Sequence, residues 1–348
     1  MSAGNRDDVT MEDPEVTARA AGLRHVDDDE PGITRVRRGT GFAYRGPDGE
    51  WLTDDATKTR MAELVVPPAW TDVWICTDPD GHVQATGRDD AGRKQHLYHP
   101  AWRVARNEAK YARLAAFPEA LALVRDAVDS GLRQRSDPRL RVLALVVALL
   151  DETLVRIGNP ESVTEHESFG LTTLRTDHVE ATTASVSFDF VGKGGARHEL
   201  SVADRRLARA VSACAERSDE RLFTWEDDRG TRHVDSADVN GWLESVTDQP
   251  WSARDFRVWG GTVAAGRALA DLEVAPDDDL DRLVLVGFDA AADRLNNTRD
   301  VARESYVHPA VPRAFHAGEL PERFARARAR TWLDRDESAI ARLLADDA

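Results

Sequence analysis

The chain has 348 residues, enough for two domains, and 41% of them are hydrophobic, which is enough for compact cores. No run reaches the roughly 18 apolar residues of a membrane span, and no signal peptide opens the chain, so we expect a cytoplasmic protein without membrane contact. Two cysteines, Cys76 and Cys214, offer neither a disulfide framework nor metal-ligand spacing. The net charge of −16 has the wrong sign for a nucleic-acid binder as a whole.

The charge is spread unevenly along the chain. Residues 1–30 hold nine acids and three arginines, and residues 271–281 hold six acids and no base. Residues 84–113 instead carry seven bases and three acids. A local basic stripe of this kind can bind phosphates while other faces of the protein stay acidic.

The N-terminal part of the chain predicts a small, mostly β domain over residues 21–104. Residues 1–20 are acidic and poor in large apolar side chains, which predicts a disordered tail. Turn sequences at 46–49 and 78–81 predict hairpins over 41–52 and 72–86. A short helix is predicted over 54–63, capped by Thr53 or Asp54.

Residues 105–348 predict a mainly helical domain. The helix from Arg139 to Ile157 is apolar nearly all round, which indicates a buried centre, and Gly158 is expected to end it in a left-handed cap. Alternating residues around a glycine-rich tip predict a hairpin over 184–202, with Lys193 at its end. Other helices are predicted at about 101–117, 118–131, 203–218, 236–247, 252–271, 283–303 and 321–345.

Tyr306 stands late in a predicted helix that Pro309 stops. Asn297, Arg299 and Arg303 precede it within a few turns. These polar and basic neighbours suit a tyrosine whose phenol oxygen attacks a phosphate. Taken alone, the pattern favours a tyrosine on an amphipathic surface helix, whose hydroxyl binds water.

Four cations are candidates for phosphate chemistry, and each has a plainer interpretation. Arg156 could grip a phosphate with two parallel hydrogen bonds, or pair with Glu152 one turn earlier. Lys193 could donate a proton to a departing alkoxide, or be solvated on a flexible tip. For Arg254 and Arg257 the plainer interpretation is two exposed arginines at the start of a helix.

Taken in order, these motifs resemble the type IB DNA topoisomerases, in the compact form found in bacteria and poxviruses. The resemblance covers nearly all of residues 22–315. The N-terminal half carries the stretches Pro67-Pro-Ala-Trp-Thr-Asp-Val-Trp-Ile, Gln84-Ala-Thr-Gly-Arg-Asp and Gly92-Arg-Lys-Gln. The C-terminal half carries Leu154-Val-Arg-Ile-Gly-Asn, Gly170-Leu-Thr-Thr-Leu, Phe190-Val-Gly-Lys, Asp255-Phe-Arg and Ser305-Tyr-Val-His-Pro.

The resemblance implies a role for each catalytic candidate. Tyr306 would be the nucleophile, Arg156 and Arg257 would bind the non-bridging oxygens, and Lys193 would be the general acid for the 5′-oxygen. Asn297 stands where many members have histidine, and it can donate a hydrogen bond but cannot shuttle a proton. Its neighbour Asn296 could compete for that role.

The resemblance also implies an α+β fold in which the small β-rich domain and the mainly helical catalytic domain form a C-shaped clamp around duplex DNA. The candidate DNA contacts are Gln84, Arg88, Arg93, Lys94, Gln95 and Tyr98 in the first domain, and Asn159 and Arg254 in the second. Arg254 departs from the family by standing where lysine is usual. His96 stands where an aromatic residue near the DNA is expected.

The expected reaction is relaxation of supercoiled DNA by cleavage of one strand through a 3′-phosphotyrosyl bond, followed by religation. The sequence contains no phosphate-binding Gly-x-x-x-x-Gly-Lys-Ser/Thr loop and no metal-ligand spacing, so we expect neither ATP, metal nor another cofactor. We expect a monomer whose partner is duplex DNA.

Two alternatives stay open at this stage. A tyrosine recombinase shares the catalytic set, but the His-x-x-Arg box usual there is absent because position 254 is arginine. A non-catalytic DNA-binding protein could keep the same fold, and the full set of Arg156, Lys193, Arg257 and Tyr306 argues against it.

Overall fold

The computed structural model describes residues 14–217 and 220–347. Contacts divide the chain into two compact units, one ending at Lys110 and one beginning at Tyr111. The division falls inside helix α3 (Pro100–Leu114). Each unit is described by itself below. Among the residues described, no helix is both long and apolar enough to cross a lipid bilayer.

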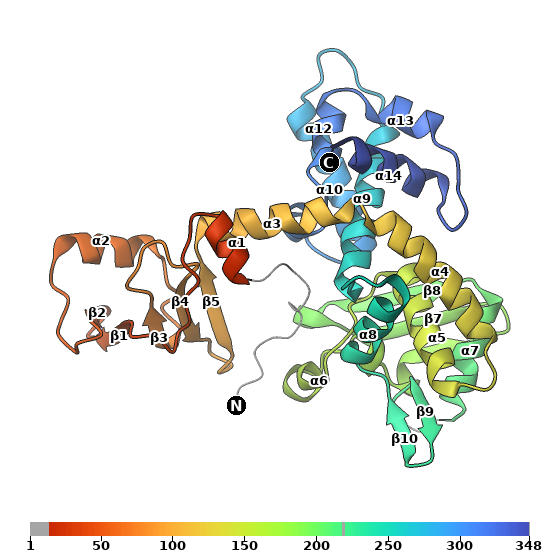
Figure 1. Ribbon diagram of the computed structural model, residues 1–348, viewed down its shortest axis with the longest axis horizontal. Coiled ribbons are helices and arrows are strands. Elements are labelled where there is room, and N and C mark those ends of the chain that lie inside the picture. Colours follow the sequence, from red (N-terminus) through yellow and green to blue (C-terminus); the bar gives the residue numbers. More distant parts are fainter. Residues whose placement is uncertain (1–13, 218–219, 348) are drawn as a thin grey trace. The chain divides into compact units, whose positions relative to one another are not determined.

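The first unit is built on a five-stranded antiparallel sheet in the order β2-β1-β3-β4-β5 (Figure 1). The strands are β1 (Ile33–Arg38), β2 (Gly41–Arg45), β3 (Thr71–Ile75), β4 (Val83–Arg88) and β5 (Lys94–Tyr98). Helix α2 (Asp55–Glu63) is capped by Asp54, as predicted. Its Met61 packs with Ile33 and Ile75 in the core of the sheet, which confirms the expected β-rich N-terminal domain.

The strand pairing differs from the sequence prediction in one hairpin. Strands β3 and β4 pair across the 78–81 turn as expected. Strand β2, however, pairs with β1, and the 46–49 turn leads only to a single bridge between Arg45 and Trp51. Strand β5 was not predicted, because it lies at the sheet edge and its polar residues hide the alternation of a buried strand.

Part of the predicted N-terminal tail is ordered. Residues 1–13 lie outside the described residues, but Pro14–Ala20 form helix α1. Ala18 is fully buried and packs with Leu23 and Trp102. The expectation of disorder was wrong for this turn of helix, because small apolar residues here find an aromatic partner far along the chain.

Arg35 explains why the Pro67-Pro-Ala-Trp stretch folds as it does. Its guanidinium donates hydrogen bonds to the carbonyl oxygens of Val66, Pro67 and Trp70, at 3.0, 2.9 and 2.7 Å. A prolyl loop has few N–H groups of its own to pair its carbonyls. The arginine on β1 therefore holds this loop to the sheet.

The second unit is mainly helical and carries two small sheets, so the fold is α+β, as expected. The helices are α4 (Phe117–Arg133), α5 (Pro138–Thr153), α6 (Pro160–His166), α7 (Arg205–Ala215), α8 (Ser236–Thr247), α9 (Ala253–Ala270), α10 (Leu280–Leu295), α11 (Arg299–Ser305), α12 (Ala310–His316), α13 (Leu320–Arg326) and α14 (Arg335–Asp347). The sheets are β6 (Val179–Ala181), β7 (Val186–Val191) and β8 (Arg197–Val202) in sequence order, and the pair β9 (Thr224–Asp227) and β10 (Gly230–His233).

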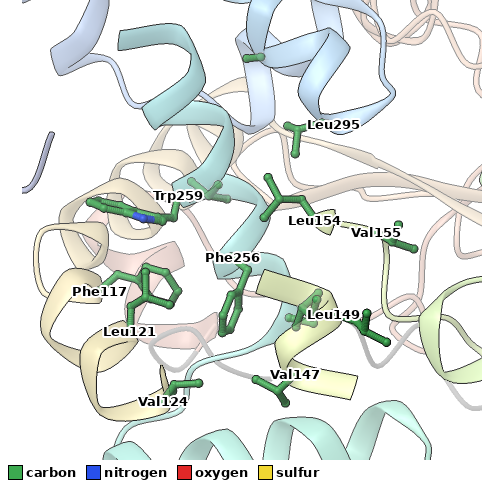
Figure 2. Packing of buried hydrophobic residues seen from close by; sticks show 14 of the residues in the cluster. Phe117, Leu121, Val124, Val147, Leu149, Leu154, Val155, Phe256, Trp259 and Leu295 are labelled. Carbon is green, nitrogen blue, oxygen red and sulfur yellow. The ribbon is translucent and has the colours of Figure 1, made fainter. Parts of the chain in front are cut away.

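Helix α5 is the buried centre of this unit, as predicted. Figure 2 shows its Val147 and Leu149 in a shared core with Phe117 of α4 and Phe256 of α9. The helix nevertheless ends at Thr153, four residues earlier than expected. Leu154 takes the left-handed conformation, with φ 55°, and its N–H donates to Leu150 O at 2.8 Å. The segment after Leu154 is therefore no longer helical.

The helix predicted over 283–303 is broken in two. Helix α10 ends at Leu295, Asn296 takes a left-handed conformation with φ 47°, and Thr298 caps α11. The stretch predicted as a helix over 321–345 likewise forms α13 and α14. The first break matters for the site described next, because α11 is only two turns long and Tyr306 closes it.

Candidate active site

Arg257 is placed by the first turns of α9. Ser252 precedes this helix, and its N–H and hydroxyl both donate to the Asp255 carboxylate at 2.8 Å. Arg257 is only 3% exposed. Its guanidinium donates to the carbonyl oxygens of Leu154 and, at 3.2 Å, Leu295. These carbonyls mark the C-terminal ends of α5 and α10, where helix dipoles favour a cation.

Tyr306 lies against this arginine. The guanidinium carbon of Arg257 is 4.9 Å from the centre of the tyrosine ring. Gly261 allows the approach, since a Cβ there would lie 2.9 Å from Tyr306 O. Burial alone would raise the pKa of the phenol. The charge and hydrogen bonding of Arg257, with the charges of Arg156 and Arg254, outweigh it and lower the pKa below its usual value.

Arg156 reaches the same place from the segment that follows α5. The prediction that it ends a rigid helix was wrong, because Leu154 has already ended α5. Its Nη2 donates to Asn297 Oδ1 at 2.9 Å, so its partner is Asn297 and not Glu152. A segment outside any helix or strand can aim a guanidinium only if something else holds its backbone.

The Gly170-Leu-Thr-Thr-Leu stretch holds that backbone. The N–H of Leu171 donates to Arg156 O at 2.8 Å, and the N–H of Thr172 donates to Ile157 O at 2.7 Å. Gly158 and Gly170 meet with no side chain between them. A Cβ on Gly170 would lie 2.5 Å from Gly158 Cα and 2.6 Å from Arg156 O. This backbone clamp fixes the position from which Arg156 reaches out.

Two buried donors at this site have no partner within the described residues. They are Arg257 Nε and Asn297 Nδ2. A buried donor without an acceptor costs roughly 1–3 kcal/mol, so an orphan of this kind calls for an explanation. Asn296 differs from its neighbour, because its amide is exposed and donates to Arg197 O at 2.9 Å. The orphaned amide beside the arginines belongs to Asn297.

Lys193 lies at the end of the predicted β-hairpin, in a 3₁₀ turn with Gly194 and Gly195. Both glycines have positive φ, +76° and +77°, which a residue with a Cβ rarely adopts. The lysine is exposed, and no hydrogen bond or ion pair ties it to any residue that the structure describes. The structure thus gathers Arg156, Arg257, Asn297 and Tyr306, and leaves Lys193 on a free tip.

The other two candidates of this unit have different surroundings. Arg254 is exposed on the first turn of α9, close enough for its charge to act on Tyr306. Asn159 caps α6, and its side-chain oxygen accepts from the N–H of Glu161 at 3.0 Å. Part of the Asn159 side chain is therefore used within the fold.

Gln84 is not available as a DNA contact, which corrects the prediction. It is 4% exposed, and its Nε2 donates to the carbonyls of Pro79 and Gly81 at 2.8 and 2.7 Å. Its side-chain oxygen accepts from Arg60 at 3.1 Å. Inside a well-formed sheet, a polar side chain with all these bonds holds the 78–81 turn together.

The remaining candidates of the first unit lie on β4 and β5 or the turn between them. Carboxylates already engage most of them. Arg93 pairs with Asp89 at 2.7 Å, and the same carboxylate accepts from Gln95 at 2.8 Å. Lys94 pairs with Asp28 at 2.7 Å. Exposed pairs of this kind contribute about 0–1 kcal/mol, so a phosphate can compete for these cations.

Arg88 and Tyr98 complete this group. Arg88 is exposed, lies 3.8 Å from the Asp72 carboxylate and donates to Gly92 O at 2.8 Å. Tyr98 is half-buried, and its ring stacks on His96 with centroids 5.7 Å apart. His96 is exposed and so presents a flat ring at the position where the resemblance leads us to expect an aromatic one.

Asp27, Asp28 and Asp29 bring carboxylate oxygens within 4.8 Å of one another. Asp28 already accepts hydrogen bonds from Lys94 at 2.8 Å and from Thr86 at 2.8 Å. Exposed acids often come this close without an ion. We assign no metal to this group.

Sequence reasoning missed His198, a lone histidine in a strand with no motif around it. It is 4% exposed and stacks on Phe190 across the hairpin. Burial, and then the charges of Arg156 and Arg257, lower the pKa of its imidazole below the usual value. The ring is therefore neutral and close to the arginine cluster.

Two family models match this chain. Residues 99–315 match the family described as the catalytic core of eukaryotic DNA topoisomerase I, and residues 41–89 match the N-terminal domain of bacterial DNA topoisomerase IB. The first match covers more than half of the chain. A DNA topoisomerase 1B of Acanthamoeba polyphaga mimivirus is 25% identical over 288 residues, covering 79% of this chain and 85% of that protein.

Proposed function

The chain belongs to the type IB DNA topoisomerases, DNA-binding enzymes that relax DNA by cleavage and religation, and from that premise we propose that Tyr306 forms the covalent link to the cleaved strand. One observation carries the proposal. Two buried hydrogen-bond donors without partners, Arg257 Nε and Asn297 Nδ2, lie in the cluster that surrounds the tyrosine. The oxygens of a DNA phosphate are acceptors of the right charge for both.

The covalent step exchanges one phosphodiester for another. Tyr306 Oη bonds to phosphorus and gives its proton to water, and its lowered pKa favours this loss. The bond from phosphorus to the 5′-oxygen breaks, and that oxygen takes a proton from Lys193 Nζ. The products are a 3′-phosphotyrosyl strand and a free 5′-hydroxyl. Religation reverses each transfer, so the energy of the bond is kept and no ATP is needed.

Charge in the transition state is stabilised by fixed cations. Arg156 and Arg257 bind the non-bridging oxygens, and Asn297 Nδ2 adds a neutral hydrogen bond. Two guanidinium groups thus do the electrostatic work that metal ions do in other phosphoryl-transfer enzymes. All five proposed catalytic residues belong to this chain, and we propose a monomeric enzyme that needs no cofactor.

The family assignment decides between the alternatives left open by the sequence. The match to the bacterial topoisomerase N-terminal domain falls on the β-rich unit, where recombinases usually have helices. A DNA-binding protein without turnover is disfavoured by the convergence of Arg156, Arg257 and Tyr306.

A relaxation assay tests the proposal directly. The purified protein should relax supercoiled plasmid in EDTA without ATP, and Tyr306→Phe should bind the plasmid but neither relax it nor form a covalent adduct. Tyr44→Phe removes a hydroxyl from the first unit and serves as the matched control, with activity expected to stay. An adduct that survives in Tyr306→Phe would place the nucleophile elsewhere, and a strict need for a divalent ion would refute the metal-free mechanism.

A further inference from the structure

We propose that His198 is a positioning residue for the general-acid step, whose ring holds the base of the β7–β8 hairpin so that Lys193 reaches the leaving 5′-oxygen. The inference rests on the proposed function, since it takes Lys193 as the proton donor. It concerns a residue that does not itself touch the DNA or the reacting atoms.

The imidazole is fixed by a stack across the hairpin. His198 on β8 lies directly opposite Phe190 on β7 in the strand register. The two ring centroids are 4.8 Å apart and the planes differ by 1°. Both side chains are almost fully buried. Cross-strand aromatic pairs of this kind stabilise a hairpin and define how its two strands face each other.

The edge of the same ring packs directly on the residue before the lysine. A Cβ built on Gly192 would lie 2.7 Å from His198 Nε2 and 2.8 Å from its Cδ2. The backbone of Gly192, at φ −99° and ψ −168°, is ordinary extended chain that any residue adopts. Glycine is therefore needed here for space, and the space is occupied by the imidazole.

The tip beyond Gly192 has little else to hold it. Gly194 and Gly195 are conformationally free, and Lys193 is exposed. At the base, Gly192 N donates to Ala196 O at 2.7 Å. A lysine on such a tip can reach a groove, but its average position depends on the direction in which the base points.

The base is anchored to the active site itself. Asn296 Nδ2 donates to Arg197 O at 2.9 Å, and Asn296 is the neighbour of Asn297. Burial, with the charges of Arg156 and Arg257, lowers the pKa of His198 and keeps the ring neutral. A neutral ring supports the hairpin near these cations without adding a positive charge that would repel Lys193.

The test compares two leaving groups in single-turnover cleavage of a duplex oligonucleotide. One substrate has the ordinary 5′-bridging oxygen, and the other has sulfur there, which leaves as a thiolate without needing a proton. A misplacement of about 1 Å can cost about a hundredfold, so His198→Ala should slow the oxygen substrate by about tenfold to a hundredfold. The His198→Ala variant should cleave the sulfur substrate at close to the wild-type rate.

Gly192→Ala is a second variant that should loosen the base of the hairpin, as His198→Ala does. Its new methyl group must displace the imidazole, so it should show the same defect and the same rescue by sulfur. Adding His198→Ala to Gly192→Ala should not deepen the loss, because both changes free the same hairpin base. Glu199→Ala is the matched control, since Glu199 is the next residue on β8 and is exposed, and both substrates should be cleaved normally.

Lys193→Ala separates failure of this inference from failure of the proposed function. If Lys193→Ala is not rescued by sulfur, the general-acid role of Lys193 is wrong. If Lys193→Ala is rescued and the His198 and Gly192 variants are equally slow on both substrates, the positioning role is overturned and His198 acts on the arginines or on stability. Full activity of His198→Ala on the oxygen substrate overturns the inference as well.

Discussion

Among single residues, Asn297 is the neutral hydrogen-bond donor within a cluster of cations. Its oxygen accepts from Arg156 at 2.9 Å, while its buried Nδ2 has no acceptor in the described structure. The two ends of one amide thus have separate tasks. One end orients a guanidinium, and the other is free for a phosphate oxygen. Substitutions at this position can separate the two.

We expect Asn297→Ala to slow cleavage roughly tenfold, less than the ~10²-fold loss typical of a fully used oxyanion donor, because the lost donor is uncharged. Asn297→His should be tolerated, since its ring can donate to the phosphate. Asn297→Asp keeps an acceptor for Arg156 but replaces the donor with a second, negatively charged oxygen, and should be slower than Asn297→Ala. Single-turnover cleavage measures all three. Equal activity of Asn297→Asp and wild type would show that Nδ2 does not face the phosphate.

At the scale of the element, the site depends on a contact between two loops. Arg156 lies outside any helix or strand, and the backbone clamp formed with Gly170 and Leu171 holds the segment from which its guanidinium reaches out. Gly170 itself has ordinary extended φ and ψ of −141° and 179°. The neighbouring backbone leaves no room for a side chain at this position. An alanine here tests that close contact alone, because its own φ and ψ are not strained.

Gly170→Ala should push the Arg156 segment away, lowering the free energy of unfolding by about 1–3 kcal/mol as overpacking does and slowing cleavage more than binding. Gly241→Ala is the matched control. A Cβ there meets nothing within 4 Å, and Gly241 lies inside α8, so this change should stabilise the fold by about 0.5–1 kcal/mol. Denaturant unfolding and cleavage rates measure both. Normal cleavage by a folded Gly170→Ala protein would argue against the clamp.

Elements with a strong local pattern could be predicted from the sequence, and their ends could not. The nearly all-round apolar character of α5 and the glycine-rich tip of the β7–β8 hairpin were sufficient to predict these two elements. The end of α5 was missed because the left-handed cap is Leu154, a residue that local preference does not place there. The α10–α11 break was missed although Asn296, like glycine, often takes the left-handed conformation at a helix end, and its N–H makes local bonds to Ala292 O and Asp293 O.

For the candidate site, too, one part could be predicted from the sequence and another could not. Arg156, Lys193, Arg257 and Tyr306 became candidates because their residue types suit phosphate chemistry, and the resemblance of the surrounding motifs to a known family then gave each of them a role. Motifs could not predict which side chains are buried. Gln84 sits in a motif but is enclosed by the fold, and His198 has no motif but lies beside the arginines. Both facts depend on partners far apart in the sequence.

At the scale of the whole molecule, the net charge of −16 has to be reconciled with binding to DNA. In the first unit, acidic side chains form ion pairs with several bases of the basic stripe. Lys94, Arg93 and Arg88 each have a carboxylate within 4 Å. If these cations bind phosphates, as we propose, each pair must open first and binding exchanges one ion pair for another. We therefore expect the acidic partners to lower the affinity for DNA without abolishing it.

Asp28 offers the sharpest test of this exchange. It pairs with Lys94 at 2.7 Å and accepts from Thr86 at 2.8 Å, which Asn can still do. Asp28→Asn should release Lys94, tighten binding to duplex DNA and steepen the salt dependence by about one counterion. Asp29→Asn removes the same charge one residue away, without touching Lys94, and should change affinity much less. Binding is measured by fluorescence anisotropy over a series of salt concentrations. If the two variants bind equally, only net charge matters, and Lys94 is not held back by its partner.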